Sequence, residues 1–221
     1  MSDVPLYYAN VMSTSLFVTG TDTGVGKTLV SALLCAALER IYWKPIQTGA
    51  QEGTDRRTVM ELARLPEERT LPECYIFDPP VSPHLAAEWA GTTIDLAKIR
   101  LPEGNLPAPL VAEGAGGVMV PVNQTEFMLD LMLRLNFPVV VVARSSLGTI
   151  NHTVLTLRAL RGAGLAVKGV VIVGPENKDN ERAIQRYGCT PIIGRVPLLE
   201  VINRAALVEV FHREFDRSVF D

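Results

Sequence analysis

The sequence predicts an α/β protein with a doubly wound, mostly parallel sheet and helices on both faces. Three observations lead to this fold class. Short apolar runs alternate with helical patterns along nearly the whole chain, as in a series of βαβ units. These runs are too short to span a bilayer and suit strands that a parallel sheet buries on both faces. The chain has 221 residues, 48% of them apolar, which suits a single domain with a large core. We expect this domain at residues 15–221, after an irregular N-terminal extension at 1–14.

Each expected strand is a run of apolar, often β-branched residues that ends at a turn signal. The second strand is very short, because Ile41-Tyr42-Trp43 leads straight into Lys44-Pro45. In chain order the expected strands are residues 15–19, 41–43, 110–112, 139–143, 167–173 and 192–194, with a further extended stretch at 118–122.

The expected helices have apolar residues three or four positions apart. Glycines mark several helix ends: Gly162 and Gly164 end one helix, and Gly188 stops another. A proline-rich stretch at 66–83 is expected to be irregular. The expected helices are residues 27–40, 55–63, 85–89, 96–99, 127–135, 151–163, 180–187 and 201–215.

Residues 16–28 combine a buried strand, a Gly- and Thr-rich turn and a helix that opens with Gly-Lys-Thr, which is the P-loop arrangement. Backbone N–H groups of such a loop surround phosphate oxygens, and the helix N-terminus adds its positive dipole end. Lys27 would reach the β- and γ-phosphates, and the Thr28 hydroxyl would hold magnesium. Gly20 and Gly26 enclose five residues where four are usual, so the loop is a variant. A glycine turn without a ligand would not explain Lys27, because the helix dipole repels a cation there.

Four residues that are far apart in the sequence follow the ends of predicted strands: Gly20, Lys44, Glu113 and Arg144. Ligands of doubly wound sheets bind at the carboxyl ends of the strands, so we expect these residues to share one crevice. A second cation there, Lys44, would stabilise the charge that develops during phosphoryl transfer. The alternative for Lys44 is an ordinary solvated surface charge.

Glu113 is an acid at the end of an apolar strand, and beside a P-loop it could help to hold magnesium. The small residues after it, 114–117, would let the backbone approach a ligand closely. The alternative is a solvated acid next to a glycine turn. The role of Asp55 has two interpretations as well. It could be a functional carboxylate, or Thr54-Asp55 could equally be the start of a helix.

The stretch 145–152 joins a strand to a helix through small residues, and its N–H groups could bind a carboxylate. An ordinary βα loop with Thr149 or Asn151 as the helix cap is an equally good interpretation. His84 and His152 lie at helix starts, where a structural role is the more common one, and the sequence has no second His or Cys at ligand spacing from either.

Composition narrows the class of protein. A net charge of −3 gives no general basic surface for nucleic acid. The three cysteines are widely spaced, resemble neither a disulfide framework nor a zinc site, and fit a reducing cytoplasm. Residues 1–14 lack the features of a signal peptide. We therefore expect a cytoplasmic protein with no nucleic-acid or membrane partner.

From about residue 16 to 197 the chain resembles the dethiobiotin synthetase family. The pieces that carry the resemblance stand in the order and spacing of that family: residues 18–23, 25–28, 44–45, 82–84, 111–117 and 147–152. The lengthened glycine loop is also that family's form. The resemblance implies that 7,8-diaminopelargonic acid reacts with CO₂ to give a carbamate, that ATP phosphorylates the carbamate, and that the second amine closes a ureido ring. It implies that magnesium is required.

The resemblance further implies roles for individual residues. ATP would bind Thr21, Asp22, Thr23, Gly24, Val25, Gly26, Lys27, Thr28, Asn177 and Pro197. Magnesium would be held by Thr28, Asp55 and Glu113. The catalytic residues would be Lys27, Lys44 and Thr23. The substrate would contact Thr48, Glu113, Gly116, Gly117, Leu147, Gly148, Thr149 and Asn151. Enzymes of this kind are homodimers with the diamine at the subunit interface.

Three features depart from the family's pattern. Gly24 stands where some members have an acidic residue, so a contact from that side chain is missing. The connection between the first helix and Lys44 is short, which leaves the reach of Lys44 open. Residues 173–175 replace an Asn that contacts adenine in some members. Asn177 is the nearby candidate substitute, and nucleobase selectivity stays open.

A second class of function is an ATP-driven switch that partitions DNA or positions division proteins on membranes. Such proteins usually have a lysine early in the P-loop, where this chain has Thr21-Asp22. Membrane-binding members end in a basic amphipathic helix. The charges within residues 201–220 are mixed here, so we expect this segment to pack on its own domain.

Overall fold

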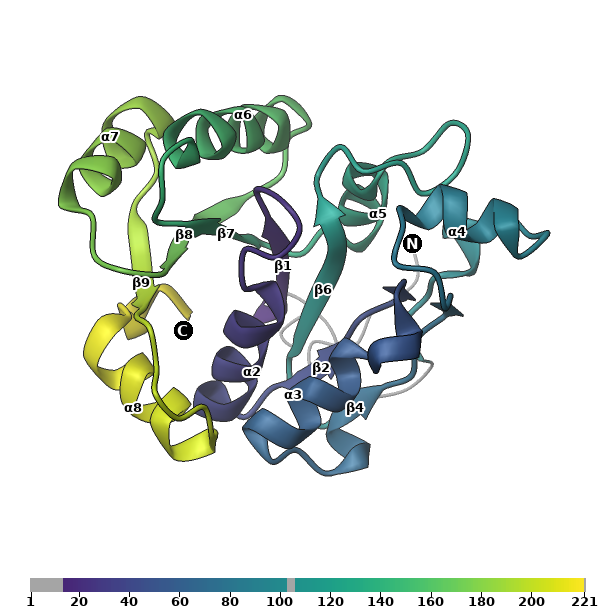
Figure 1. Cartoon of the computed structure of the whole chain (residues 1–221), viewed down its shortest axis with the longest axis horizontal. Coiled ribbons are helices and arrows are strands. Elements are labelled where there is room, and N and C mark those ends of the chain that lie inside the picture. The colour runs from purple at the N-terminus through teal and green to yellow at the C-terminus, as the bar shows by residue number, and fades with distance from the viewer. Residues whose placement is uncertain (1–13, 103–105, 221) are drawn as a thin grey trace, which may run out of the picture.

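A seven-stranded parallel sheet forms the centre of the protein, in a computed structural model that describes residues 14–102 and 106–220 (Figure 1). Its strands are β1 (Leu16–Gly20), β2 (Ile41–Trp43), β4 (Thr70–Leu71), β6 (Leu110–Gly117), β7 (Val139–Arg144), β8 (Val167–Val173) and β9 (Ile192–Val196). Their order across the sheet is β4-β2-β6-β1-β7-β8-β9, and every neighbouring pair is parallel. A separate parallel pair consists of β3 (Ile46–Gln47) and β5 (Tyr75–Ile76). The predicted fold class is confirmed. Of the predicted extension at 1–14, only Thr14 lies within the described residues.

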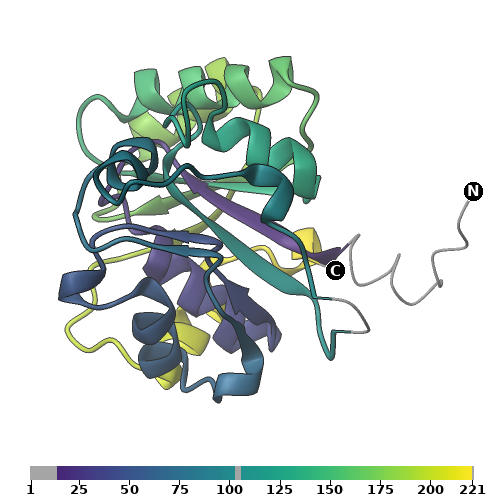
Figure 2. The same ribbon diagram turned by 90° about the vertical axis from the view of Figure 1, so that its right-hand side faces the viewer.

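Helices cover both faces of the sheet, so the protein has three layers (Figure 2). One face carries α2 (Lys27–Leu38), α3 (Asp55–Ala63) and α8 (Arg204–Glu214). The core on the other face is covered by α4 (Pro83–Trp89), α5 (Met128–Leu135), α6 (Thr149–Gly162) and α7 (Lys178–Gly188). The short 3₁₀ turns are η1 (Ala50–Glu52), η2 (Glu67–Arg69), η3 (Leu96–Lys98) and η4 (Arg217–Phe220). Within the two described ranges, no helix has the length and apolar character needed to cross a membrane.

The strand β6 is longer than predicted, and Glu113 lies within it instead of after its end. β6 pairs with β1 as far as the pair Gly20 and Gly117. The register shifts between Val18 and Gly20, and the pairing continues beyond this shift. The glycines beyond Glu113 continue the strand because β1 still offers backbone partners there. The stretch 118–122, predicted to be extended, begins instead with a turn in which the Val120 N–H donates to the Gly117 carbonyl at 3.2 Å.

Several helix limits also differ from the prediction. α6 begins two residues early, at Thr149, because Gly148 takes the N-cap position with a φ of 91°. The helix predicted at 201–215 begins only after Asn203, whose side chain caps it by accepting a backbone N–H at 3.0 Å. The helix predicted at 96–99 is a single 3₁₀ turn. The proline-rich stretch 66–83, predicted to be irregular, contributes the short β4 and β5 and the turn η2 before α4 begins.

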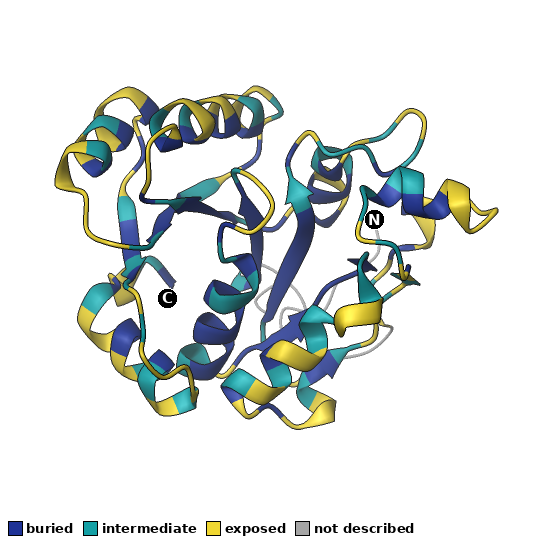
Figure 3. Cartoon of the chain, viewed as in Figure 1, coloured by how far each residue is buried: buried dark blue, intermediate teal, exposed yellow. Residues whose placement is uncertain are grey.

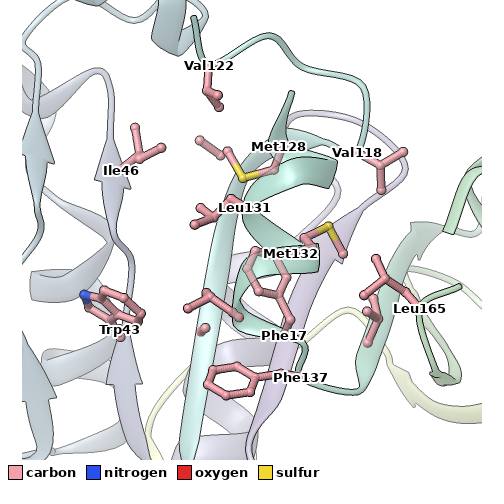
Figure 4. Close-up of a cluster of buried hydrophobic side chains, with 14 of the residues drawn as sticks. Phe17, Trp43, Ile46, Val118, Val122, Met128, Leu131, Met132, Phe137 and Leu165 are labelled. Carbon is pink, nitrogen blue, oxygen red and sulfur yellow. The ribbon is translucent and has the colours of Figure 1, made fainter. Parts of the chain in front are cut away.

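The side chains of the central strands point alternately into two hydrophobic cores, one on each face of the sheet. In β1, Phe17 belongs to the core on the α5 side, and Leu16 and Val18 belong to the core under α2. The strands are buried along most of their length, and the exposed residues lie on the outer faces of the helices and in the loops (Figure 3). Figure 4 shows the first core, in which Phe17 lies beside Met132 of α5. The apolar runs of the sequence are therefore strands buried on both faces, as predicted.

Arg40 holds the two ends of the described domain together. It lies between α2 and β2 and is 4% exposed. One guanidinium N–H donates to the Thr14 carbonyl, and another donates to the Phe220 carbonyl at 2.9 Å. Thr14 and Phe220 thus meet at the amino-terminal edge of the sheet, opposite the carboxyl edge where ligands bind in this architecture.

Candidate active site

The loop between β1 and α2 has the backbone conformation of a phosphate-binding loop. Gly24 and Gly26 have φ values of 70° and 98°, in the left-handed region that favours glycine. Gly26 is the N-cap residue of α2, and no side chain caps this helix. A Cβ atom on Gly20 would lie 2.8 Å from the Asp22 carbonyl oxygen, so the loop leaves no room for a side chain there. The N–H groups at the start of α2 are thus available to an anion.

Lys27 folds back across the loop. Its Nζ donates to the Asp22 carbonyl oxygen at 2.9 Å, and the residue is 7% exposed. Burial lowers the pKa of Lys27, and Lys44 adds to this effect against the opposing influence of Glu113. A bound phosphate would add its negative charge to those of Glu113, Asp55 and Asp22. The carboxylate of Asp22 pairs at 2.5 Å with Arg144, the last residue of β7.

Glu113 lies at the centre of a buried polar cluster beside the loop. The Thr28 hydroxyl donates to Glu113 Oε1 at 3.0 Å, and Lys44 Nζ lies 3.4 Å from the same oxygen. Lys44 also forms an ion pair with Asp55. Glu113 and Lys44 are 1% and 6% exposed, so neither is the solvated surface charge considered as an alternative. The cluster brings the three predicted magnesium ligands together with a predicted catalytic lysine.

Lys44 stays charged although it is buried. Burial alone would lower the pKa of Lys44, but the carboxylates of Glu113 and Asp55 raise it above its ordinary value. The short connection that precedes this residue does not keep it from the cluster, because Lys44 directly follows β2 and reaches both carboxylates. The ammonium therefore compensates two negative charges at the wall of the site.

Asp55 is the first residue of α3 but does not cap it. Thr54 is the cap, and its hydroxyl accepts a first-turn N–H at 3.2 Å. Gln47 holds the neighbouring backbone: its Oε1 accepts the Asp55 N–H at 3.0 Å, and its Nε2 donates to the Thr48 carbonyl at 2.7 Å. The Asp55 carboxylate is thereby left to pair with Lys44.

The sequence did not single out two residues of this cluster, Tyr42 and Gln47. The fully buried Tyr42 hydroxyl donates to Glu113 Oε2 at 3.0 Å. Burial, together with the Glu113 charge, raises the pKa of Tyr42 well above its ordinary value, so the hydroxyl keeps its proton. Alternation along each strand does not reveal this contact, because it is the register between β2 and β6 that puts Tyr42 on the same face of the sheet as Val111 and Glu113. For Gln47 the sequence offered no signal either.

The cluster opens into a cleft of about 720 Å³ at the carboxyl edge of the sheet. The predicted residues that line it are Thr23, Gly24, Gly26, Lys27, Thr28, Lys44, Thr48, Asp55, Glu113 and Gly116. A second hollow of about 370 Å³ shares Thr23 and Val120 with the cleft. The predicted residues Thr21, Asp22 and Gly117 line this second hollow.

Other predicted residues are not among those that line the cleft. Asn177 caps α7, its Oδ1 accepting an N–H at 3.0 Å, and Pro197 directly follows β9. The predicted substrate residues Leu147, Gly148, Thr149 and Asn151 surround the start of α6. Gly148 is the cap there, so neither Thr149 nor Asn151 has the capping role considered as an alternative.

The oxygen donors of the cluster suit magnesium. A threonine hydroxyl and two carboxylates are hard oxygen ligands, which magnesium accepts together with water and phosphate oxygens. In the part of the chain that the structure describes, no three His, Cys, Asp or Glu side chains gather as they would around a transition metal. The donor set fits a magnesium ion held jointly with a nucleotide, and its role as a metal site stays a prediction.

A strand, a glycine loop, a buried lysine at a helix N-terminus and an acid on the adjacent parallel strand define a P-loop nucleotide-binding protein. The ATP-dependent dethiobiotin synthetase BioD of Rhodopseudomonas palustris (strain HaA2) is 46% identical over 209 residues, which cover 95% of this chain and 97% of that protein. The protein of the same name from Nitrobacter hamburgensis is 49% identical over 200 residues, covering 90% and 93%. The chain belongs to the ATP-dependent dethiobiotin synthetase family and is an enzyme of that family, so the predicted resemblance is confirmed.

Two further comparisons concern the domain and the fold. A family model described as an AAA domain matches residues 14–206. A ParA family ATPase from Chlorobium tepidum TLS superposes with a TM-score of 0.50 at 11% identity, over 95% of this chain and 97% of that chain. The MinC:MinD cell division protein complex of Aquifex aeolicus gives a TM-score of 0.52 at 16% identity, over 84% and 82%. At these identities the likeness shows a shared fold and carries no function.

Proposed function

We propose that this enzyme acts as a ligase of biotin biosynthesis and forms dethiobiotin from 7,8-diaminopelargonic acid, CO₂ and ATP. Family membership supports the general role. The observation that carries the chemistry is the pair of buried lysines, Lys27 in the loop and Lys44 in the carboxylate cluster. A bound triphosphate accounts for the first lysine. Lys44 pairs with Asp55 and Glu113. Magnesium held by these carboxylates would leave the Lys44 ammonium available to a second anion, which a carbamate would supply.

The proposed reaction has three steps. One amino group of the diamine adds to the carbon of CO₂ and loses a proton, which gives a carbamate. A carbamate oxygen attacks the γ-phosphorus of ATP, the bond to ADP breaks, and a mixed carbamic-phosphoric anhydride forms. The second amine attacks the carbon of this anhydride, phosphate leaves, and the loss of a proton completes the ureido ring.

The residues of the cleft would stabilise the charge that these steps develop. Lys27 and Lys44 would neutralise the carbamate and the transferring phosphoryl group. Thr23, which lines both the cleft and the adjoining hollow, would act beside them. Magnesium would neutralise the β- and γ-phosphates. The residues that would hold it are Thr28, Asp55 and Glu113.

The nucleotide would lie along residues 21–28, with its phosphates on the loop and its base toward Asn177 and Pro197. Val173 packs against the loop, because a Cβ atom on Gly26 would lie 3.1 Å from Val173 Cγ1. The Asn177 side chain is already engaged as a helix cap. We therefore expect weak selectivity for adenine, which competition by other nucleoside triphosphates would measure.

We also propose a homodimer in which the diamine lies at the subunit interface. The tail carboxylate would bind residues 147–151 of the second subunit. Exposed apolar side chains support this arrangement: Leu147 is 98% exposed, Leu155 57% and Met119 54%, and the last two line the hollow beside the cleft. The residues that would contact the diamine within one subunit are Thr48, Glu113, Gly116 and Gly117.

Phosphate release tests the reaction. With ATP, magnesium and bicarbonate present, we expect release to depend on added diaminopelargonic acid. Lys27→Ala should abolish this release, because the loop loses its phosphate-binding ammonium, and should leave the circular dichroism spectrum unchanged. ATP hydrolysis that is indifferent to the diamine would contradict the proposal, and full turnover by the Lys27 variant would remove the P-loop assignment.

Stimulation of the hydrolysis by DNA or lipid instead of the diamine would support the ATPase switch considered above. No nucleic-acid or membrane partner is part of the proposal. A cytoplasmic location is also proposed, and the free thiols of Cys35, Cys74 and Cys189 support it.

A further inference from the structure

We propose that Tyr42 is a positioning residue for the cation site: its hydroxyl orients the Glu113 carboxylate so that Oε1 faces Thr28 and the cleft. This inference rests on the proposed function, since it concerns the magnesium that the reaction would require. It adds a residue that lies outside the P-loop and does not line the cleft.

The register of the sheet places Tyr42 beside Val111, two residues before Glu113 on the neighbouring strand. Tyr42 is the central residue of β2 and pairs with Val111 of β6. Glu113 lies two residues further along β6, so its side chain leaves the same face of the sheet. Tyr42 and Val111 both belong to the core under α2. The phenol thus extends along the buried face toward the carboxylate and meets it with its hydroxyl at 3.0 Å.

The two oxygens of Glu113 have different partners. Oε1 accepts from Thr28 at 3.0 Å and lies 3.4 Å from Lys44 Nζ, on the side of the predicted metal. Oε2 accepts from Tyr42 at 3.0 Å, and within residues 14–102 and 106–220 no other hydrogen bond reaches it. A hydrogen bond to a buried carboxylate is charge-assisted and directional. Without the phenol, Oε2 would be a buried charged oxygen with no donor, and the carboxylate would gain rotational freedom.

A purely structural role for the phenol predicts a different result. If Tyr42 only filled the core, Tyr42→Phe would keep the ring and lower stability slightly without changing the cation site. A positioning role predicts weaker cation binding, because residues that hold a metal ligand typically contribute about 10–100-fold to metal affinity.

The test measures cation affinity directly. Wild type, Tyr42→Phe and the control Tyr75→Phe are titrated with Mn²⁺ in the presence of a non-hydrolysable ATP analogue, and free Mn²⁺ is followed by electron paramagnetic resonance. The control also removes a hydrogen-bonded phenol, since Tyr75 OH accepts the Asp95 N–H at 3.0 Å away from the cleft. We expect Tyr42→Phe to weaken Mn²⁺ binding about tenfold and Tyr75→Phe to leave it unchanged. Thermal unfolding of each variant establishes that it is folded.

A double variant shows whether Tyr42 acts through Glu113. In the Glu113→Gln background, adding Tyr42→Phe should cause little further loss of Mn²⁺ affinity. Wild-type affinity in Tyr42→Phe would overturn the inference, and so would equal losses in both backgrounds. Unchanged affinity in Glu113→Gln would overturn the metal assignment and this inference with it. The two proposals can fail separately. If Tyr42→Phe weakens Mn²⁺ binding as expected but the wild type shows no diamine-dependent phosphate release, Tyr42 is still a positioning residue for the cation site, and only the proposed reaction is wrong.

Discussion

Lys44 separates two carboxylates that would otherwise repel each other inside the protein. Its ammonium pairs with Asp55 and with Glu113, and the Glu113 side chain is 0% exposed. Removing one partner of a buried pair is strongly destabilising, because the remaining charge stays desolvated and unpaired. Lys44 therefore has a structural role as well as the proposed catalytic one.

Lys44→Gln should lower the free energy of unfolding by about 3 kcal/mol in the absence of divalent cations. Magnesium should restore part of this loss, because it binds the folded state and supplies the missing positive charge. Urea denaturation with EDTA and with magnesium measures both effects. The control is Arg57→Gln, which breaks the exposed pair with Glu61 and should cost less than about 1 kcal/mol. Equal losses in both variants, or no effect of magnesium on Lys44→Gln, would contradict this account.

The lowered pKa of Lys27 predicts a pH dependence of nucleotide binding. Burial lowers this pKa in the free protein, and bound phosphates favour the charged ammonium and raise it again. Nucleotide binding at alkaline pH should thus take up a proton, and affinity should fall as the pH rises through the lowered pKa. Calorimetry over a series of alkaline pH values, in buffers of different ionisation enthalpy, detects the uptake. Proton release, or uptake that persists in Lys27→Ala, would assign the effect to another group.

At the level of elements, β9 is held in place by contacts that exclude any larger residue at Gly194. A Cβ atom there would lie 2.4–2.6 Å from three ring atoms of Phe215, the residue that follows α8. Gly194→Ala should cost about 1–3 kcal/mol of stability through overpacking. Gly162→Ala is the matched control: its Cβ meets nothing within 4 Å, so a small gain of about 0.5 kcal/mol is expected from the lower entropy of the unfolded chain. Thermal unfolding compares the two, and losses of the same size in both would argue against a specific clash.

The elements that sequence predicted well are those with one dominant physical signal. The strands of the sheet are buried on both faces, so apolar runs marked most of them, and the loop at 20–28 has a spacing that few other functions need. The sequence-based prediction failed where contacts with neighbouring strands determine the extent of a strand or the role of a side chain. β6 runs on through Glu113 and four small residues because β1 lies beside it, and no local propensity of Gly114–Gly117 favours a strand. Tyr42 went unnoticed because its role depends on the register between β2 and β6.

At the scale of the whole molecule, the exposed apolar side chains near the cleft predict self-association. Leu155→Glu would place a charge in the proposed interface and should shift the protein from dimer to monomer. Tyr187→Glu is the control, since Tyr187 is 63% exposed on α7, outside the residues that line the hollow. Sedimentation velocity distinguishes the two variants. A monomeric wild type would contradict the proposed dimer.

Subunit mixing tests whether the partner completes the cleft. Lys27→Ala removes the phosphate-binding lysine, and Asn151→Asp places a negative charge where the substrate carboxylate would bind. Each variant alone should be inactive. Mixed dimers should regain diamine-dependent phosphate release, because one of their two clefts would combine an intact loop with an intact 147–151 segment. No recovery on mixing would mean that each chain binds the diamine by itself.

The hydrogen bonds from Arg40 to Thr14 and Phe220 have a practical consequence for attaching other molecules to this enzyme. Since one guanidinium binds the carbonyls of Thr14 and Phe220, these two residues lie side by side, on the edge away from the cleft. A tag, a fluorescent protein or a surface tether joined at Thr14 or after Phe220 would therefore start on the edge of the sheet away from the cleft. A short linker between Thr14 and Phe220 could also close the chain, so that a circular permutant with new ends in an exposed loop would keep the same sheet and the same cleft.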